Sequence, residues 1–249
     1  MTHVAIVTGG SRGIGAATCV MLAKAGYHVV ANYVSNKAAA EKVAAEIVRS
    51  GGKASIVQGD VANESDIVQL FKAADKFGAL KILVNNAGVV DVKARVDEMS
   101  AERLTRMFTI NVTGSILCAR EAVKRMSTRH GGPGGAIVNL SSAAATLGAP
   151  GQYVDYAASK GAIDTFTIGL AREVAQEGIR VNAVRAGIID TDIHASGGEP
   201  ERAAQLRSQI PMLREGTAEE VAETIIWLAS DKASYVTGAC LSVSGGRSV

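Results

Sequence analysis

The sequence lacks any large excess of charge, because 26 Lys and Arg stand against 24 Asp and Glu, for a formal net charge of +2. A near-neutral chain creates no strong field toward nucleic acid or an anionic membrane, so any binding must come from a local site. Cysteine is also scarce. Cys19, Cys118 and Cys240 are odd in number, far apart and without C-x-x-C spacing, which predicts free, buried thiols in a reducing cytoplasm.

Segments that direct a chain to or across a membrane are also lacking. The N-terminus has no basic region and only a short apolar run before its glycines, which disfavours a signal peptide. The longest uncharged stretch, 130–154, is interrupted by glycines, prolines and Asn139, which disfavours a membrane-spanning helix. We therefore expect a cytoplasmic protein without nucleic-acid or membrane partners.

Hydrophobic residues, by contrast, make up 47% of the 249 residues, which is enough for a sizeable core. Short β-rich runs alternate with longer helical patterns almost to the C-terminus. The expected strands are 4–8, 28–33, 54–58, 81–85, 136–141, 180–184 and 240–243, and the expected helices are 14–25, 37–50, 64–77, 101–127, 155–176 and one that begins at 217. This alternation predicts an α/β fold, with one doubly wound parallel sheet of about seven strands and helices on both faces.

No linker or repeat divides this pattern, so we expect a single domain over 1–249. Its one extended gap is about 190–216, which contains Gly197-Gly198, two prolines and a weak helical pattern. A long segment of this kind in a compact domain is usually functional. We expect it to act as a substrate lid.

Glycines follow the first expected strand directly, in the run Thr8-Gly9-Gly10-Ser11-Arg12-Gly13-Ile14-Gly15. Glycines let a backbone approach a pyrophosphate, whose charge is met by the N–H groups and the positive end of the following helix. The run therefore predicts dinucleotide binding by Gly9, Ser11, Arg12, Gly13, Ile14 and Gly15. Its G-x-x-x-G-x-G spacing differs from the common G-x-G-x-x-G, and tight strand–helix packing is the alternative.

The same run also matches G-x-S-x-G, the nucleophile elbow of α/β-hydrolases. An elbow needs an oxyanion-hole loop from an earlier strand, and only eight residues precede Gly9. His130 and His194 stand in no recognisable catalytic setting. A hydrolase is therefore the weakest hypothesis.

The end of the second expected strand bears on the choice of cofactor. An acid that holds the ribose of NAD is expected there, but the strand ends in Asn32-Tyr33. Arg12 lies in the glycine loop and offers a guanidinium, which favours the 2′-phosphate of NADP. Two alternatives stay open: Arg12 is a solvated loop residue, or Asn32 and Ser35 bind ribose hydroxyls and permit NAD.

Tyr156 and Lys160 are four residues apart in an expected helix, so their side chains share one face. A cation about 4 Å from a phenol lowers the phenol pKa by up to about three units at an effective dielectric of 20. The spacing alone is a weak signal. It gains weight from the strand 136–141, which delivers hydroxyls to the edge where α/β ligands bind, so that Ser142 could hydrogen-bond a substrate oxygen.

Together these motifs resemble the short-chain dehydrogenase/reductase family over essentially the whole chain, with a Rossmann-type fold. The length and layout are closest to its 3-oxoacyl-[acyl-carrier-protein] reductase and glucose 1-dehydrogenase branches. The motifs that carry the resemblance are Thr8-Gly9 with Gly13 and Gly15, Gly59-Asp60-Val61, Asn85-Asn86-Ala87-Gly88, Asn111, Ser142, and Tyr156 with Lys160.

The resemblance implies a role for each matching residue. Asp60, followed by Val61, would contact adenine, and Thr191 would help to hold the nicotinamide carboxamide. Asn111 would hold a water in a proton relay through Lys160. The turn that lines the cofactor would be Asn86, Ala87 and Gly88, and the catalytic tetrad would be Asn111, Ser142, Tyr156 and Lys160, of which Tyr156 and Lys160 also contact the cofactor.

Three departures from the family pattern stand out. Ala186-Gly187 replaces Pro-Gly beside the nicotinamide, where Gly187 would still contact the cofactor. The segment 152–155 lengthens the serine–tyrosine interval by one residue, so Ser142 is our choice and Ser141 the alternative. Ser244 replaces an acid near the C-terminus, which puts in question any subunit contact that depends on it.

The leading hypothesis is an NADP-preferring oxidoreductase that moves a hydride between nicotinamide and a carbonyl or secondary alcohol, with Tyr156 as general acid/base and no metal. A catalytically silent nucleotide-binding regulator is the alternative. The substrate stays open between an acyl chain on a carrier protein, a sugar and a small ketone. An acidic carrier protein could use four cations, but cations at helix ends are more often dipole partners. These are Lys124, Arg125, Arg129 and Arg172.

The helices 101–127 and 157–174 are apolar on more than one face. One face of each should pack on the sheet, which leaves an apolar surplus. We therefore expect a homo-oligomer, and specifically a tetramer.

Overall fold

The computed structural model describes residues 2–191, 198–199 and 201–248. Its strands are β1 (His3–Val7), β2 (His28–Tyr33), β3 (Lys53–Gln58), β4 (Ala79–Asn85), β5 (Gly135–Ser142), β6 (Ile179–Ala186) and β7 (Cys240–Val243). Its helices are α1 (Gly13–Lys24), α2 (Lys37–Arg49), α3 (Glu64–Asp75), α4 (Ala101–Phe108), α5 (Gly114–Met126), α6 (Ala144–Leu147), α7 (Val154–Val174), α9 (Arg202–Gln205) and α10 (Ala218–Ala229).

The seven strands form one sheet in the order β3-β2-β1-β4-β5-β6-β7, and every neighbouring pair is parallel. The predicted α/β fold with about seven parallel strands is therefore confirmed. The chain reverses direction across the sheet between β1 and β4. In such sheets, ligands bind at this switch point, outside the carboxyl ends of the strands.

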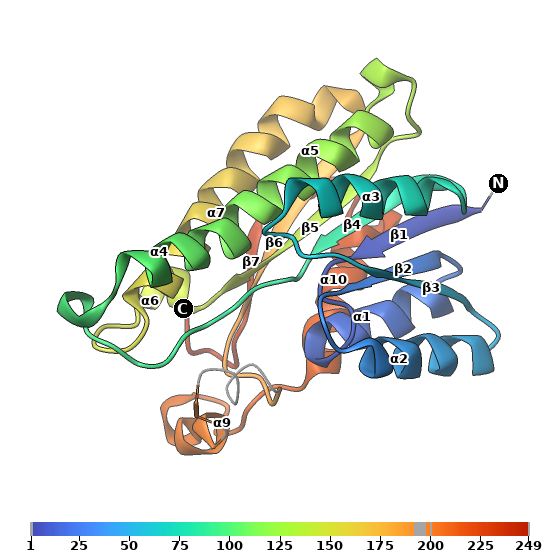
Figure 1. The fold of residues 1–249 in the computed structure, drawn as a ribbon. Helices are drawn as coiled ribbons and strands as arrows, with labels where there is room; N and C mark the ends of the chain where they lie inside the picture. The colour runs from blue at the N-terminus through green and yellow to red at the C-terminus, as the bar shows by residue number, and fades with distance from the viewer. Residues whose placement is uncertain (1, 192–197, 200, 249) are drawn as a thin grey trace.

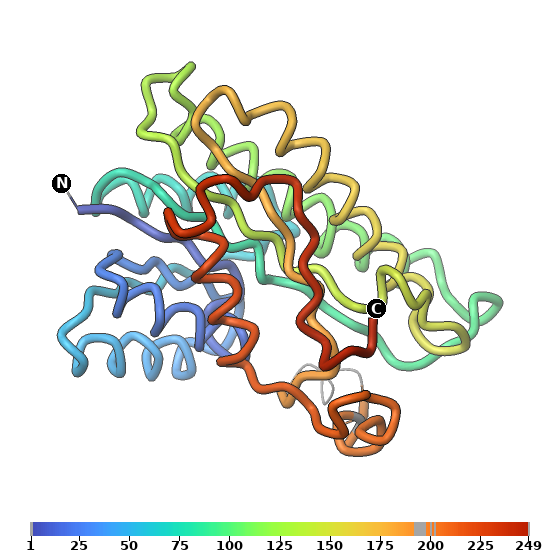
Figure 2. The backbone as a smooth tube through the Cα atoms, turned by 180° about the vertical axis from the view of Figure 1, so that it is seen from behind, coloured from blue at the N-terminus to red at the C-terminus, as the bar shows by residue number. Residues whose placement is uncertain are grey.

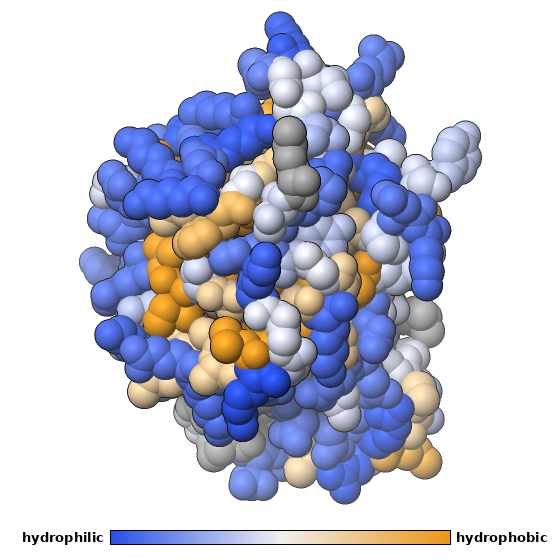
Figure 3. Space-filling model, turned by 90° about the vertical axis from the view of Figure 1, so that its right-hand side faces the viewer, coloured by the Kyte–Doolittle hydropathy of each residue, from blue (hydrophilic) through white to orange (hydrophobic). Residues whose placement is uncertain are grey.

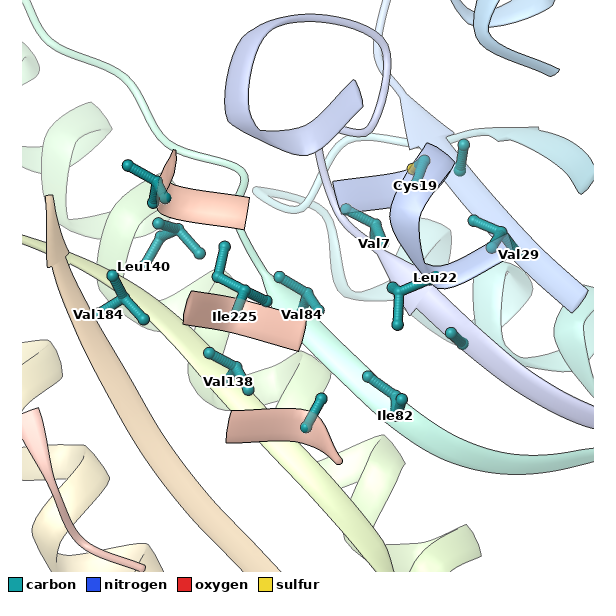
Figure 4. Close-up of a cluster of buried hydrophobic side chains, with 14 of the residues drawn as sticks. Val7, Cys19, Leu22, Val29, Ile82, Val84, Val138, Leu140, Val184 and Ile225 are labelled. Carbon is teal, nitrogen blue, oxygen red and sulfur yellow. The ribbon is translucent and has the colours of Figure 1, made fainter. Parts of the chain in front are cut away.

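Helices cover both faces of the sheet (Figure 1). On one face, α1 and α10 pack against the strands through side chains such as Leu22 and Ile225 (Figure 4). On the other, α3, α5 and α7 bury a second core that includes Phe71 and Met126. Because both faces are covered, the central strands read as continuous apolar runs, which made them visible in the sequence.

The long predicted helix at 101–127 is one helical run in three parts. Between α4 and α5 lies a short π-helical segment, Thr109–Thr113, and Figure 1 shows the two α-helices following each other along one line. A π-turn adds one residue to the turn, which a pattern of period 3.6 does not reveal. The prediction of an uninterrupted α-helix was wrong at this point.

The segment 190–216 leaves the sheet and returns to where it began. The Asp190 N–H donates to the Gly216 carbonyl, and the Gly216 N–H donates to the Ile188 carbonyl. In between, α9 and a short 3₁₀ turn (Arg207–Gln209) lie beyond the carboxyl ends of the strands (Figure 1). Residues 192–197, which include His194, lie outside the described residues, so the lid stays a prediction.

The cysteines follow the prediction in part. All three are free thiols, and Cys19 and Cys118 are buried. Cys240 is only half-buried, because it lies on β7 at the edge of the sheet, and its prediction as a buried thiol was wrong. Among the described residues, no helix is long and apolar enough to span a membrane.

A buried ion pair ties α4 to the start of α7. The Arg103 guanidinium donates to both carboxylate oxygens of Asp155, at 2.7 and 3.1 Å, and to the Val92 carbonyl at 2.6 Å. The Asp155 side chain is fully buried and that of Arg103 is 9% exposed. Asp155 directly precedes Tyr156, so this clamp fixes the backbone that carries the tyrosine.

We predict that Arg103→Ala lowers the free energy of unfolding by about 3–5 kcal/mol, because it leaves a buried carboxylate without its partner. In a chain of this size the loss corresponds to a fall in Tm of about 6 °C or more. Thermal unfolding followed by circular dichroism measures it. The control is Arg95→Ala, since Arg95 pairs with Asp97 on the surface; equal Tm values for the two variants would contradict the prediction.

Candidate active site

A pocket of about 320 Å³ lies at the carboxyl ends of the strands. Ile14 at the start of α1, Asn86 and Gly88 after β4, and Ser142 at the end of β5 line it. Tyr156 and Lys160 from α7 reach the same pocket, as do Gly187 and Thr191 after β6. The structure thus brings the glycine loop and the Tyr–Lys pair, more than a hundred residues apart in sequence, to one cavity.

The turns after β1 and β4 are held together by hydrogen bonds. The Thr8 hydroxyl accepts from the backbone N–H groups of Asn86 and Ala87, both at 3.0 Å. The Asn86 side-chain amide donates to the carbonyls of Thr8 and Gly9, both at 2.9 Å. Asn86 therefore shapes the glycine loop from across the switch point, and Ala87 and Gly88 continue from it along the pocket.

The glycine loop presents the N-terminal end of α1 without a protein cap. Gly9 has φ of +62°, and a Cβ on Gly15 would lie 2.3 Å from the Gly9 carbonyl oxygen, so both positions require glycine. Arg12 at the N-cap forms no side-chain capping hydrogen bond, and the first turn of α1 has no acid. Side chains do cap α2, α3, α4 and α10. The N–H groups at the start of α1 fit an anionic group.

The ribose end of the site differs in part from the prediction. The Asn32 side chain is buried, accepts from the Gly9 N–H at 3.3 Å and donates to the Gly59 carbonyl at 2.8 Å. It thus ties the glycine loop to the turn after β3, and its contact with a ribose stays a prediction. Tyr33 is also buried, whereas Arg12 is exposed.

The predicted adenine residues follow β3. The Asp60 N–H donates to the Asp66 carboxylate, and an Asp60 carboxylate oxygen accepts from the Ala62 N–H, so this turn is fixed by its own hydrogen bonds. Val61 is buried, and its carbonyl oxygen lies 2.6 Å from where a Cβ on Gly114 would be. Asp60 is partly exposed and remains accessible.

Ser142 and Tyr156 meet in the pocket. Burial raises the pKa of the Tyr156 phenol above its usual range, and a hydrogen bond with the Ser142 side chain acts in the opposite direction. We expected Lys160 to lower this pKa, and that prediction was wrong for the chain on its own, because desolvation outweighs the other influences. Ser141 instead donates to the Lys160 carbonyl at 3.4 Å, so Ser142 is the serine that contacts the phenol.

Lys160 is buried, and its ammonium donates to the Leu140 carbonyl at 2.6 Å. Its Nζ lies 5.7 Å from the centre of the Tyr156 ring, as expected for residues one helical turn apart. Burial lowers the pKa of Lys160 to about 8, and the Asp164 carboxylate acts in the opposite direction. The lysine is therefore a cation at neutral pH that gives up its proton more readily than an exposed lysine.

Asn111 lies in the π-helical segment and is buried beside the same site. Its side chain accepts from the Val89 N–H at 2.8 Å and donates to the Ser159 hydroxyl at 3.1 Å. A Cβ on Gly88 would lie 3.3 Å from the Asn111 Oδ1 and 3.6 Å from the Lys160 Nζ. Asn111 and Lys160 thus converge on Gly88. The water that Asn111 is predicted to hold stays a prediction.

After β6, the chain turns through the Ala186-Gly187 that departs from the family pattern. Gly187 is required there, because a Cβ would lie 2.6 Å from the Ser244 Cα. Ser244 is buried, and its hydroxyl accepts from the Ser248 N–H, so this side chain makes its hydrogen bond within the chain. Thr191 lies against the glycine loop, with its Cγ2 3.2 Å from where a Cβ on Gly13 would be.

The sequence analysis missed two features of the pocket wall. Tyr153, three residues before Tyr156, lines the pocket and donates to the Glu199 carboxylate at 2.6 Å, and Lys93 pairs with the same carboxylate. The i, i+3 spacing of the two tyrosines was the signal available. Arg247 also lines the pocket, and Figures 1 and 2 both place the C-terminal end beside α6.

Comparison with known proteins agrees with this geometry. A family model described as enoyl-(acyl carrier protein) reductase matches residues 9–248. The chain is 56% identical over 245 residues to an uncharacterized oxidoreductase, YgfF, of Escherichia coli, covering 98% of this chain and 99% of the relative. It is 42% identical over 246 residues to a 3-oxoacyl-[acyl-carrier-protein] reductase of Synechocystis, covering 98% and 96%.

A crystal structure of a short chain dehydrogenase from Burkholderia cenocepacia, in complex with NADP, superposes with a TM-score of 0.90. It is 32% identical in sequence and covers 98% of this chain and 97% of its own. Family model, relatives and structure agree over nearly the whole chain. This protein therefore belongs to the short-chain dehydrogenase/reductase family and is an oxidoreductase of the Rossmann-like fold.

Proposed function

We propose that the protein is an NADP-dependent reductase of a small-molecule carbonyl, with Tyr156 as general acid. The observation that carries this proposal is the meeting of Ser142, Tyr156 and Lys160 in one pocket with the uncapped end of α1. The reverse reaction, oxidation of a secondary alcohol, uses the same groups. A hydrolase gains no support, because His130 is exposed on a turn at residues 128–130.

The chain fits a nicotinamide dinucleotide. The N–H groups at the start of α1 would hold the pyrophosphate, and the turn from Asn86 to Gly88 would line the path to the nicotinamide. Arg12 would hold a 2′-phosphate, and the NADP bound by the Burkholderia relative supports this choice. Lys37 follows β2 and pairs with Glu41, and Asn36 caps α2. Arg12 is the stronger candidate because it is exposed and belongs to the glycine loop itself.

The chain's own residues handle the proton. A phenol with a raised pKa is protonated at neutral pH, so Tyr156 donates a proton to the carbonyl oxygen as negative charge develops on it. Ser142 hydrogen-bonds that oxygen and the phenol. Lys160 then stabilises the phenolate by its charge and returns a proton toward Tyr156. When bound, the dinucleotide supplies the hydride.

We predict that Tyr156→Phe lowers turnover at least about 100-fold while NADPH binding stays close to wild type, because proton transfer needs the hydroxyl and phosphate binding does not. A carbonyl panel read by NADPH absorbance, with titration calorimetry for binding, measures both. Tyr235→Phe, at a fully exposed tyrosine, is the control. If wild type binds NADPH but turns over nothing in the panel or its alcohol counterpart, the silent regulator becomes the better account.

Cofactor choice gives a second prediction. Loss of a charge-assisted hydrogen bond costs about 1.5–3 kcal/mol, so Arg12→Ala should weaken NADPH about 10- to 150-fold and leave NADH unchanged. The control is Arg49→Ala, at an exposed arginine near the end of α2. Arg12→Ala is a cleaner test than Tyr33→Asp, because Tyr33 is buried and an acid there would also disturb folding. A wild type that binds NADH more tightly than NADPH would refute the NADP assignment.

The substrate class we propose is a small carbonyl compound rather than an acyl chain on a carrier protein. Three of the four cations considered for an acidic carrier are already paired within the chain. Lys124 and Arg125 both contact Glu121, and Arg129 lies 4.0 Å from Glu177. Their charge is therefore largely compensated where a carrier would dock.

We also propose that the chain acts as one domain, in the cytoplasm. Strands from near the start of the chain to near its end lie in the single sheet, and the two large cores pack on its two faces. The free thiols of the described chain are those of a protein kept in a reducing compartment.

Self-association is proposed from the outer faces of α4, α5 and α7. Leu104, Phe108, Ile116 and Ile168 on these helices are each 38–40% exposed. The face in Figure 3, by contrast, is mostly hydrophilic, with hydrophobic residues in small separated groups. Exposed large apolar residues on adjacent helices mark an interaction surface, and a second copy of this chain is the occupant we propose.

We predict a tetramer at micromolar concentration, and Ile116→Glu should reduce its mass, because the charge would be buried in the interface. Light scattering coupled to size exclusion measures the mass. Val48→Glu, at an exposed valine on α2, is the matched control and should leave it unchanged. A monomeric wild type would end the proposal.

A further inference from the structure

Asp164 lies one helical turn beyond Lys160 on α7 and is buried. Its Oδ2 accepts from the Arg185 Nε at 2.8 Å, which joins α7 to β6. Its Oδ1 is also buried but has no hydrogen-bond partner among the described residues. This carboxylate is thus only half satisfied, and a buried polar atom in that state calls for an explanation.

Two neighbouring side chains donate to backbone carbonyls, and one of them, the Cys240 thiol, also interacts with the Asp164 side chain. The Cys240 thiol on β7 contacts the Asp164 carbonyl oxygen, and Ser141 on β5 donates to the Lys160 carbonyl. Arg185 holds one carboxylate oxygen through a charge-assisted hydrogen bond of 2.8 Å. The other oxygen belongs to an acidic side chain one helical turn away from Lys160.

The charges around Lys160 can be assigned element by element among the described residues. On α7 itself, Tyr156 is a neutral phenol, and Asp155 is neutralised by Arg103 from α4. From β5 come the Leu140 carbonyl and two hydroxyls, and from β7 comes the Cys240 thiol, which is neutral because burial raises its pKa to about 11. Arg185 on β6 faces Asp164. Asp164 is the anion that acts on Lys160, and it raises the pKa that burial lowers.

We propose that Asp164 is a positioning residue that keeps the buried Lys160 ammonium protonated, and that Arg185 holds its carboxylate in place and limits its strength. The inference rests on the proposed function in one respect, since it assigns Asp164 a part in proton supply to Tyr156. It explains the unpaired oxygen: a hydrogen bond there would draw the charge away from the lysine. It also explains why an ion pair is buried beneath a helix next to the pocket.

The test measures the protonation of Lys160 directly, without any substrate. The protein is labelled with ¹³Cε-lysine, and the Lys160 signal is assigned by its loss in Lys160→Arg and followed by NMR against pH. Wild type should titrate near pH 8, and Asp164→Asn should lower the midpoint by up to about two units, the size expected for a charge one helical turn away at an effective dielectric of 20. The Asn carbonyl can still accept from Arg185, which favours folding.

Three further variants complete the experiment. Asp164→Ser removes the charge and leaves room for water, so it must lower the midpoint as well, and it serves if Asp164→Asn does not fold. Asp164→Glu keeps the charge and should stay near wild type. Glu173→Gln makes the same charge change at an exposed position of α7 and should leave the midpoint unchanged. An unchanged midpoint in both Asp164→Asn and Asp164→Ser overturns the proposal.

The rate profile then separates this proposal from the proposed function. If Lys160 serves Tyr156, activity falls as pH rises through the Lys160 midpoint, and in Asp164→Asn this alkaline limb should move down by the same pH interval as the NMR midpoint. If the midpoint moves but the limb does not, Asp164 sets the charge and Lys160 does not limit proton supply, which overturns the catalytic part alone. A protein without turnover would refute the proposed function and leave the titration result standing.

Discussion

The parallel direction of all seven strands is the constraint on which the rest of the structure depends. Because every strand ends at the same edge, the residues after β1, β4, β5 and β6 meet there, although they are spread over most of the sequence. The gap between β1 and β4 then becomes the site, since the chain leaves the sheet in opposite directions on either side of it. The hydrogen bonds between Thr8 and Asn86 hold the turns after β1 and β4 in a fixed geometry.

The elements with a local cause were predicted well. Apolar strands buried on both faces and helices opened by Asn63 or Thr217 are visible in a few adjacent residues, and the structure places them within a few residues of the expected bounds. The candidate site followed from the same logic, because the Tyr156–Lys160 spacing and the glycine run each fix a local geometry. Neither pattern shows how burial and distant neighbours set the hydrogen bonds and pKa values of these residues.

Most of the features that were missed depend on residues far apart in sequence. Arg103 and Asp155 are 52 residues apart, and Asn32 reaches Gly9 and Gly59 across the ends of three strands. The raised pKa of Tyr156 is a property of the whole enclosure, whereas the sequence shows only the nearby cation. The π-helical segment is the local exception, because one extra residue in a turn leaves the apolar pattern almost unchanged.

Several features of the pocket lower the stability of the fold but suit a binding site. Four helices begin with a capping side chain, whereas α1, α5, α6 and α7 do not, and of these α1 begins in the glycine loop at the pocket. Ala149 lines the pocket with φ of 46°, a left-handed conformation that costs a non-glycine residue about 1–2 kcal/mol. Burial lowers the pKa of Lys160. Each feature lowers the stability of the fold. In return, the pocket has N–H groups that can bind an anion, a wall of fixed shape and a lysine that can exchange a proton. Their concentration at one edge of the sheet is itself an argument that this edge is where the protein works.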